Sequence, residues 1–375
     1  MFPQIPKEEF TTRVKTARER MKEQGLDALA VYSYKSAATK YLSGYSPRWS
    51  VTNAALYTLP IDGEPMMLTR LQFHLPTVLR EAVIPNVKVC GAARLGTTPM
   101  DAMAEECAAF LKDQGKNEGK IGLVGYAPEM GIELPLRKAL PKATFIDANP
   151  LLDAMRRIKT ENELRLIARS AEASTYAMGE AMLVAKAGVH EQEVYMAAES
   201  AMRRKGASAV HLFFGTVKDT KTYHRPVDRR LEKGDIGRIE GIPEVGGYCA
   251  ETTGHFAIES APPELKAKFE EVVQAHFATA DYMQPGRTIG EVVEYMKTIG
   301  SEVSRRLGHG MGLDNIESPE TIREGDKTVI EPGMVFSIHP HLRVEQFTDI
   351  VWGGTVIITK KGGVSTLSRY PEFVT

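Results

Sequence analysis

The stretch Gly234–Glu251, which reads GDIGRIEGIPEVGGYCAE, carries two acidic residues, Glu240 and Glu251, eleven positions apart. Turn-forming glycines, among them Gly246 and Gly247, lie between them, and alternating apolar residues flank each side. This pattern predicts two antiparallel strands joined by a short turn. Both carboxylates would then face one cavity, where they repel each other unless a cation, a shared proton or a basic partner compensates them. Two solvated glutamates on an exposed strand face remain the alternative.

The composition is that of a soluble globular protein. The 375 residues are 43% hydrophobic with a net charge of -1, which gives no electrostatic reason to expect nucleic acid or an anionic membrane as partner. Three widely spaced cysteines without a CxxC motif favour a reducing, cytoplasmic setting and argue against a thiolate metal site. The charged N-terminus has no apolar signal region, and no apolar run approaches the roughly 20 residues that span a bilayer.

The first 155 residues alternate helix and strand patterns. Apolar residues at helical spacing predict an amphipathic helix over residues 7–24, and a buried strand follows at 27–33. Two apolar runs around Asp62-Gly63 predict a hairpin over 55–69. We therefore expect an α/β domain over residues 1–155.

The remainder, residues 156–375, forms a second domain. Thr160 and Glu163 have the form of a capping box, so a new helix begins there. The segment 186–194 (KAGVHEQEV) resembles 284–292 (QPGRTIGEV) at an offset of 98 residues, and each stands between two helical patterns. A duplicated α+β half would build a pseudo-twofold sheet with a central cavity.

Four histidines add to the chemistry of the two glutamates. His224 lies shortly before the hairpin, His309 lies between two glycines, and His339 and His341 flank Pro340. Neighbouring glycines allow a ligand to approach His309 closely because they have no side chains. Any one of these histidines is more readily explained as a surface residue or a satisfied core residue than as a ligand, whereas their convergence would make a site.

The second domain resembles the pita-bread fold shared by creatinase, aminopeptidase P, prolidase and methionine aminopeptidase. The segments that carry the resemblance are GDIGRIEGIPEVGGYCAETTGHF, GHGMGLDNIESP, IEPGMVFSIHP and TVIIT. The first half resembles the creatinase-type N-terminal domain through ATKYLSGY (38–45) and RRIKTENELRLI (156–167). The resemblance implies an α/β domain followed by an α+β pita-bread catalytic domain.

The metallopeptidases of this family hold two metal ions with Asp, Asp, His, Glu and Glu. The resemblance places these ligands on Glu240, Glu251, His309, His339 and Gly353, so that only the histidine is kept in kind. The last carboxylate normally bridges the two ions, and Gly353 has no side chain. A standard dinuclear peptidase is therefore not expected.

Three hypotheses remain. In the first, the protein is similar to creatinase, which uses this fold without metal, and it hydrolyses a C–N bond with His224 as general acid/base. Glu240, Glu251, His309 and His339 then serve in catalysis, although a catalytic glutamate of creatinase falls on Thr253 here.

In the second hypothesis, Glu240, Glu251, His309 and His339 bind one zinc, iron or manganese ion. In the third, the site is degenerate and the domain is a binding module. The first hypothesis needs no cofactor, and it is the one we prefer.

Further residues are expected to bind a small polar substrate. Arg238 lies two positions before Glu240, so both face one side of a strand, and His341 belongs to the histidine cluster. Because creatinase completes its site across a dimer, the resemblance also implies a homodimer in which Tyr45 and Arg48 cap the partner's cavity.

Overall fold

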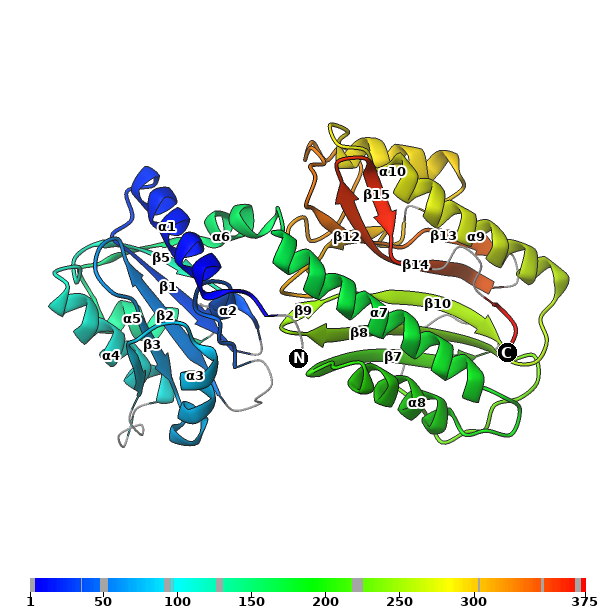
Figure 1. Cartoon of the computed structure of the whole chain (residues 1–375), viewed down its shortest axis with the longest axis horizontal. Coiled ribbons are helices and arrows are strands. Elements are labelled where there is room, and N and C mark those ends of the chain that lie inside the picture. The colour runs from blue at the N-terminus through cyan, green and yellow to red at the C-terminus, as the bar shows by residue number, and fades with distance from the viewer. Residues whose placement is uncertain are drawn as a thin grey trace. The chain divides into compact units, whose positions relative to one another are not determined.

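The chain folds into two compact units that divide between Arg156 and Arg157 (Figure 1). The expected division lay at residues 155 and 156. The computed structural model describes residues 4–34, 36–47, 53–90, 96, 98–125, 131–217, 225–302, 304–344, 347–367 and 372–375.

The N-terminal unit is built on a mixed sheet of six strands in the order β4-β3-β2-β1-β5-β6. The predicted hairpin is present, because β2 and β3 pair antiparallel on either side of Asp62-Gly63. The remaining strands join through helices, as α/β chains do. The strands are β1 (Ala28–Ser33), β2 (Ala55–Pro60), β3 (Met66–Thr69), β4 (Val87–Val89), β5 (Lys120–Val124) and β6 (Thr144–Asp147). The helices are α1 (Lys7–Glu23), α2 (Ala38–Ser43), η1 (Gln72–His74), α3 (Leu75–Glu81), α4 (Pro99–Asp113), α5 (Glu133–Ala139) and α6 (Asn149–Arg156).

The C-terminal unit contains an antiparallel sheet of nine strands, whose main path runs β11-β12-β14-β10-β8-β7. The strands are β7 (Ala209–Val217), β8 (Ile236–Val245), β9 (Tyr248–Cys249), β10 (Thr252–Ala257), β11 (Gly308–Gly310), β12 (Val335–Ile338), β13 (His341–Val344), β14 (Phe347–Thr359) and β15 (Gly362–Ser365). The helices are α7 (Glu161–Val184), α8 (Glu191–Arg204), α9 (Pro263–Tyr282) and α10 (Ile289–Thr298). The predicted hairpin is β8 and β9, and its turn residues Gly246 and Gly247 both have positive φ.

The internal repeat is visible in the backbone. Gly188 and Gly286, 98 positions apart, have φ of +87° and +92° and end the turns that precede α8 and α10. Each of these helices starts two residues later in a capping box, at His190 and Thr288. The duplicated sequence therefore encodes a duplicated helix–turn–helix unit.

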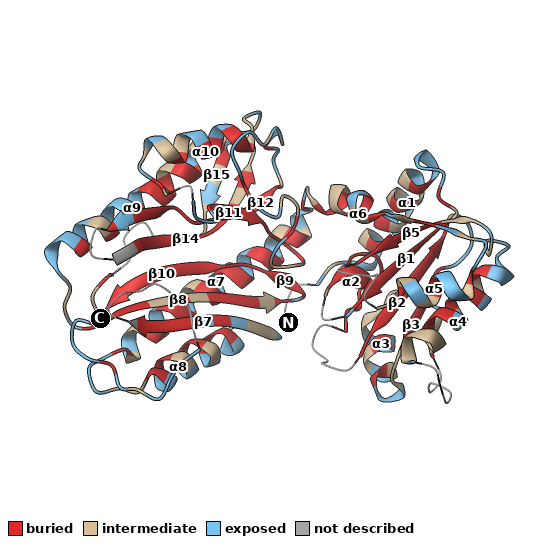
Figure 2. Cartoon of the chain, turned by 180° about the vertical axis from the view of Figure 1, so that it is seen from behind, coloured by how far each residue is buried: buried red, intermediate tan, exposed pale blue. Residues whose placement is uncertain are grey.

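The four helices of the C-terminal unit pack on one face of its sheet. A Cβ atom on Gly241 would contact Met202 of α8, and one on Gly254 would contact Met178 of α7. The ring of Trp352 in β14 meets Phe269 of α9 edge-on at 5.5 Å. Buried residues fill the strands, and exposed residues occupy the outer sides of the helices (Figure 2).

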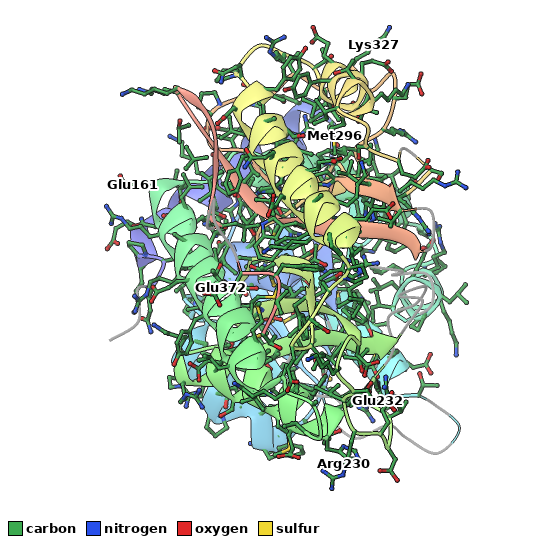
Figure 3. The ribbon with its side chains drawn as sticks, turned by 90° about the vertical axis from the view of Figure 1, so that its right-hand side faces the viewer. Glu161, Arg230, Glu232, Met296, Lys327 and Glu372 are labelled. Atoms are coloured by element: carbon green, nitrogen blue, oxygen red, sulfur yellow. The ribbon has the colours of Figure 1, made fainter. Side chains whose placement is uncertain are left out.

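Charged side chains lie on the outer surface of this unit. Glu161, Arg230 and Lys327 extend away from the body of the unit, whereas Met296 of α10 is fully buried (Figure 3). No helix in the described part of the chain is both long and apolar enough to cross a membrane.

Candidate functional site

Strand alternation separates the site from the helices. Side chains of directly paired residues in an antiparallel sheet point to the same face, and their neighbours in sequence point to the other. Arg238 pairs with His255, Glu240 pairs with Thr253, and Thr253 also pairs with Gly353. These five positions alternate with the helix-facing ones. They therefore belong to the opposite face, which we call the site face.

Glu251 lies between β9 and β10 on the site face and is 1% exposed. Its backbone is held by Thr355 of β14: the Glu251 amide donates to Thr355 Oγ1 at 2.9 Å, and the Thr355 amide donates to the Glu251 carbonyl at 3.1 Å. A buried carboxylate requires partners, because burial of an isolated charge is costly.

His309 lies in β11 between two glycines and pairs with Ser337 of β12. Gly308 has a φ of +155°, and a Cβ there would collide with the Ser337 carbonyl; at Gly310 a Cβ would lie 2.7 Å from the Ser318 carbonyl. The glycines therefore let β11 approach its neighbours closely. The Nδ1 atom of His309 lies 3.0 Å from the Gly310 carbonyl, so that Nδ1 donates and Nε2 faces Glu251.

His339 follows directly after β12. Its amide donates to the Leu307 carbonyl at 2.8 Å, and its Nε2 lies 2.7 Å from Ser337 Oγ. Ser337 therefore fixes the ring of His339 and pairs with His309 in the backbone register.

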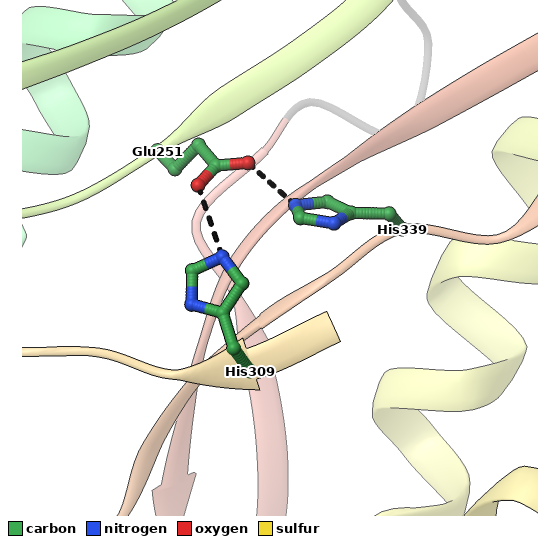
Figure 4. Close-up of side chains that lie close together, drawn as sticks. All are labelled: Glu251, His309 and His339. Atoms are coloured by element: carbon green, nitrogen blue, oxygen red, sulfur yellow. Dashed lines mark ion pairs between the residues drawn. The ribbon is translucent and has the colours of Figure 1, made fainter. Parts of the chain in front are cut away.

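Glu251, His309 and His339 form one group, which we call the Glu251 cluster (Figure 4). Each residue has one potential metal-ligand atom, a ring nitrogen or a carboxylate oxygen, and these three atoms lie within 4.8 Å of one another. His309 Nε2 is 3.4 Å from Glu251 Oε2, and His339 Nε2 is 2.5 Å from Glu251 Oε1. Burial raises the pKa of the Glu251 carboxyl, but the charge of His339 and the hydrogen bonds from both imidazoles outweigh burial and lower this pKa well below its ordinary value.

Gly353, which the resemblance places on the bridging carboxylate, has no room for a side chain. A Cβ built on Gly353 would collide with the Ile338 carbonyl and lie 2.9 Å from Cα of His339. Both obstacles are backbone atoms, which cannot rotate away as a side chain can.

The structure separates the predicted site residues into groups. The side chains of Glu251, His309 and His339 converge. Glu240 lies on the site face but is not part of this group, so three of the four expected metal ligands come together. Arg238 and Glu240 lie on one side of β8, as alternation predicts.

The expected contribution of the N-terminal unit differs. Tyr45 is 0% exposed, and its hydroxyl accepts a hydrogen bond from Asn53 at 3.0 Å. A side chain buried inside its own unit does not suit the expected role of capping a partner subunit's cavity. His224 and Arg48 lie outside the described residues.

A second polar group on the site face was only partly predicted. His341, expected to bind substrate, lies with Nδ1 2.5 Å from Asp349 Oδ2. Burial lowers the pKa of His341 despite the opposing effect of Asp349. Asp349 gave no sequence signal except its alternation with Val351 and Gly353 in β14.

His255 is the other neighbour of this group. Its Nδ1 accepts a hydrogen bond from the Val351 amide at 3.0 Å. Burial, helped by the charge of Arg238, lowers the pKa of His255 to about 3, so the ring is neutral.

Comparison with known proteins agrees with this architecture. The profile of the metallopeptidase family M24 matches residues 165–360, and that of the creatinase/prolidase N-terminal domain matches residues 13–158. The putative dipeptidase YkvY of Bacillus subtilis is 30% identical over 247 residues, which cover 63% of this chain and 67% of that protein. The creatinase of a Bacillus species is 21% identical over 98% of this chain and 92% of its own length.

The fold also matches solved structures. The prolidase from Pyrococcus horikoshii superposes with a TM-score of 0.79 at 22% identity, covering 96% of this chain and 99% of that one. The prolidase from Thermococcus sibiricus gives 0.82 at 19% identity, over 97% and 98% of the two chains. The predicted combination of an α/β domain and a pita-bread domain is thereby confirmed.

Proposed function

We propose, since this chain belongs to the metallopeptidase family M24, that it hydrolyses a C–N bond of a small polar substrate at the Glu251 cluster. The convergence of Glu251, His309 and His339 on one sheet face supports this proposal, together with the closed position at Gly353. We infer the reaction class from the family, and we infer from the residues of this chain which groups carry out the reaction.

The residues do not fit a pair of metal ions. A carboxylate that bridges two ions would have to extend from Gly353, where even a Cβ collides with backbone. We therefore propose that no dinuclear centre operates here, and we derive no step through one.

In the preferred form, the reaction uses proton transfer by imidazole. The resemblance to creatinase assigns the general acid/base to His224, which would take a proton from the attacking water and return it to the leaving nitrogen. The new C–O bond forms as the C–N bond breaks. Imidazole suits this role because its ordinary pKa lies near neutral pH. His309 and His339 compensate the charge of Glu251 and leave the cluster ready to orient a polar group.

A specific observation favours a second form, with one cation. Glu251, His309 and His339 are all buried, and each brings one potential metal-ligand atom to within 4.8 Å of the other two. One carboxylate and two imidazoles suit zinc, iron or manganese. Such an ion, when bound, would polarise a carbonyl oxygen or acidify a water molecule.

Metal analysis of the purified protein and turnover assays test these forms together. The substrate panel contains guanidino, ureido, amide and Xaa-Pro compounds, each assayed with and without a chelator. Turnover that survives chelation in protein without bound metal supports the preferred form. One equivalent of metal with chelator-sensitive turnover supports the single-cation form. Ligand binding without turnover of any compound would instead identify a binding module and contradict the proposal.

We also propose that the protein is a homodimer, as the resemblance to creatinase implies. Sedimentation equilibrium should give twice the mass of 41.4 kDa. A monomer at micromolar concentration would contradict this proposal.

A further inference from the structure

His341 and Asp349 form a buried pair on the site face, beside the Glu251 cluster. His341 begins β13 and pairs with Val351 of β14, and it lies two residues after His339. The two side chains are nearly sealed from solvent, at 7% and 4% exposure, and His341 Nδ1 lies 2.5 Å from Asp349 Oδ2.

The pair fixes which ring nitrogen of His341 carries the proton. Asp349 faces His341 Nδ1 through one carboxylate oxygen and the Arg305 guanidinium through the other, the arrangement of an ionised carboxylate between two N–H donors. An ionised carboxylate only accepts hydrogen bonds. A singly protonated His341 ring therefore has its proton on Nδ1 and its lone pair on Nε2.

The orientation of the ring is also fixed through its backbone. The His341 amide donates to Ser301 Oγ at 3.2 Å, and the His341 carbonyl accepts from the Glu302 amide at 2.7 Å. The Asp349 carboxylate is held from its other side by Arg305, whose Nη2 lies 3.3 Å from Oδ1.

The Nε2 atom of His341 differs from that of the neighbouring His255. The His255 ring accepts from the Val351 amide through Nδ1, so its proton is on Nε2, which is sealed and has no partner. Nε2 of His341 makes no hydrogen bond with the described residues, but unlike Nε2 of His255 it is not fully buried. The lone pair of His341 is therefore accessible on the site face.

We propose that Asp349 is a positioning residue that holds His341 so that its Nε2 lone pair accepts a hydrogen bond from an N–H of the group that is hydrolysed. The substrate class is thus an amide, ureido or guanidino compound with hydrogen on the nitrogen near the scissile bond. An Xaa-Pro peptide lacks that hydrogen, because the proline nitrogen is fully substituted. This inference rests on the proposed function, since it takes the Glu251 cluster as the reacting centre.

Matched probes test this selectivity. Each probe pair consists of an acyl-amino acid and its N-methyl counterpart, because methylation removes the sole N–H of such an amide. We expect wild-type protein to bind the N–H member about 10- to 100-fold more tightly, the effect of a lost hydrogen bond to a buried group. Isothermal titration calorimetry measures this ratio, and kcat/KM measures it again for any pair that is turned over.

Substitutions test whether His341 and Asp349 cause this difference in probe affinity. Asp349→Asn introduces an amide that can donate or accept a hydrogen bond, so the tautomer of His341 is no longer fixed. The affinity ratio of the N–H and N-methyl probes should then fall toward 1, and KM should change more than kcat. Asp349→Glu should restore part of it, and His341→Phe should abolish it. His276→Asn is the matched control, since His276 is also buried but bonds Ser365 in another part of the fold, and its ratio should equal that of wild type.

The outcomes separate this inference from the proposed function. Equal binding of N–H and N-methyl probes by wild-type protein, or failure to bind any N–H probe, overturns the inference. An equal loss of the ratio in the His276→Asn control also overturns it. Turnover of no probe contradicts the proposed function, while a binding ratio that depends on Asp349 would still support the role of the pair in recognition.

Discussion

The two faces of the C-terminal sheet share the same strands but use opposite chemistry. In β14, Trp352 points to the helices and meets Phe269, whereas its neighbour Gly353 belongs to the site face opposite Thr253. The helix face is apolar and closely packed, and the site face carries histidines and carboxylates. Alternation lets one face change its chemistry while the other preserves the packing.

The largest effect should come from the site face. Glu251→Gln keeps the shape of the side chain but removes the charge that His309 and His339 compensate. We expect turnover of the best panel compound to fall by about 10²- to 10⁴-fold. Initial rates measure the loss, and near-ultraviolet circular dichroism checks that the protein is folded.

Glu291→Gln is the control for this substitution. Glu291 closes the capping box of α10 on the helix side, and Gln fills the same role in such boxes. Its turnover should stay within about twofold of wild type. Equal losses in both variants would mean that the two faces are not functionally separate.

On the helix face, the corresponding effect is on stability. Trp352→Ala removes the ring that packs against Phe269 and covers Gly254, and we expect about 3–5 kcal/mol of destabilisation. Urea unfolding measures it, while the activity per folded molecule should change far less than in Glu251→Gln. A small stability change with a large loss of activity would reverse our assignment of the two faces.

Local sequence patterns predicted several elements of the fold. Helical spacing predicted α1, and the capping box at Thr160 was predicted where α7 begins. The repeat at an offset of 98 residues anticipated the paired turns at Gly188 and Gly286. These features depend on residues near one another in sequence, so hydrophobic periodicity and turn-forming residues are enough to predict them.

The site was less predictable because it depends on strand register. Residue type and the resemblance selected Glu251, His309 and His339, but only the structure shows that Glu240 does not join them. The pairing of β13 with β14 places His341 beside Asp349, and no local pattern reports such a pairing.

Glycine substitutions offer a smaller and sharper comparison of the faces. At Gly353 an added Cβ meets backbone, whereas at Gly254 it meets the ring of Trp352. We expect Gly353→Ala to destabilise the protein by about 1–3 kcal/mol, the usual cost of overpacking. Gly254→Ala should cost less, since a ring can shift.

A second substitution distinguishes the two causes. The added cost of Gly254→Ala should diminish in a Trp352→Leu background, because the obstacle is then removed, whereas that of Gly353→Ala should be unchanged. Urea unfolding midpoints of the three single variants and the two double variants give these differences. Relief of Gly353→Ala by Trp352→Leu would show that the two faces are coupled through β14.

The smallest effects should come from the helix caps, which also compare the halves of the C-terminal unit. The Thr160 side chain accepts from the Glu163 amide at 3.3 Å, and Thr288 accepts from the Glu291 amide at the same distance. Thr160→Ala and Thr288→Ala should each cost about 1 kcal/mol in unfolding free energy, because each leaves a first-turn amide without its acceptor. Both should leave turnover unchanged, since the helices begin away from the site face. A loss of turnover confined to one variant would show that its half, unlike the other, transmits helix packing to the Glu251 cluster.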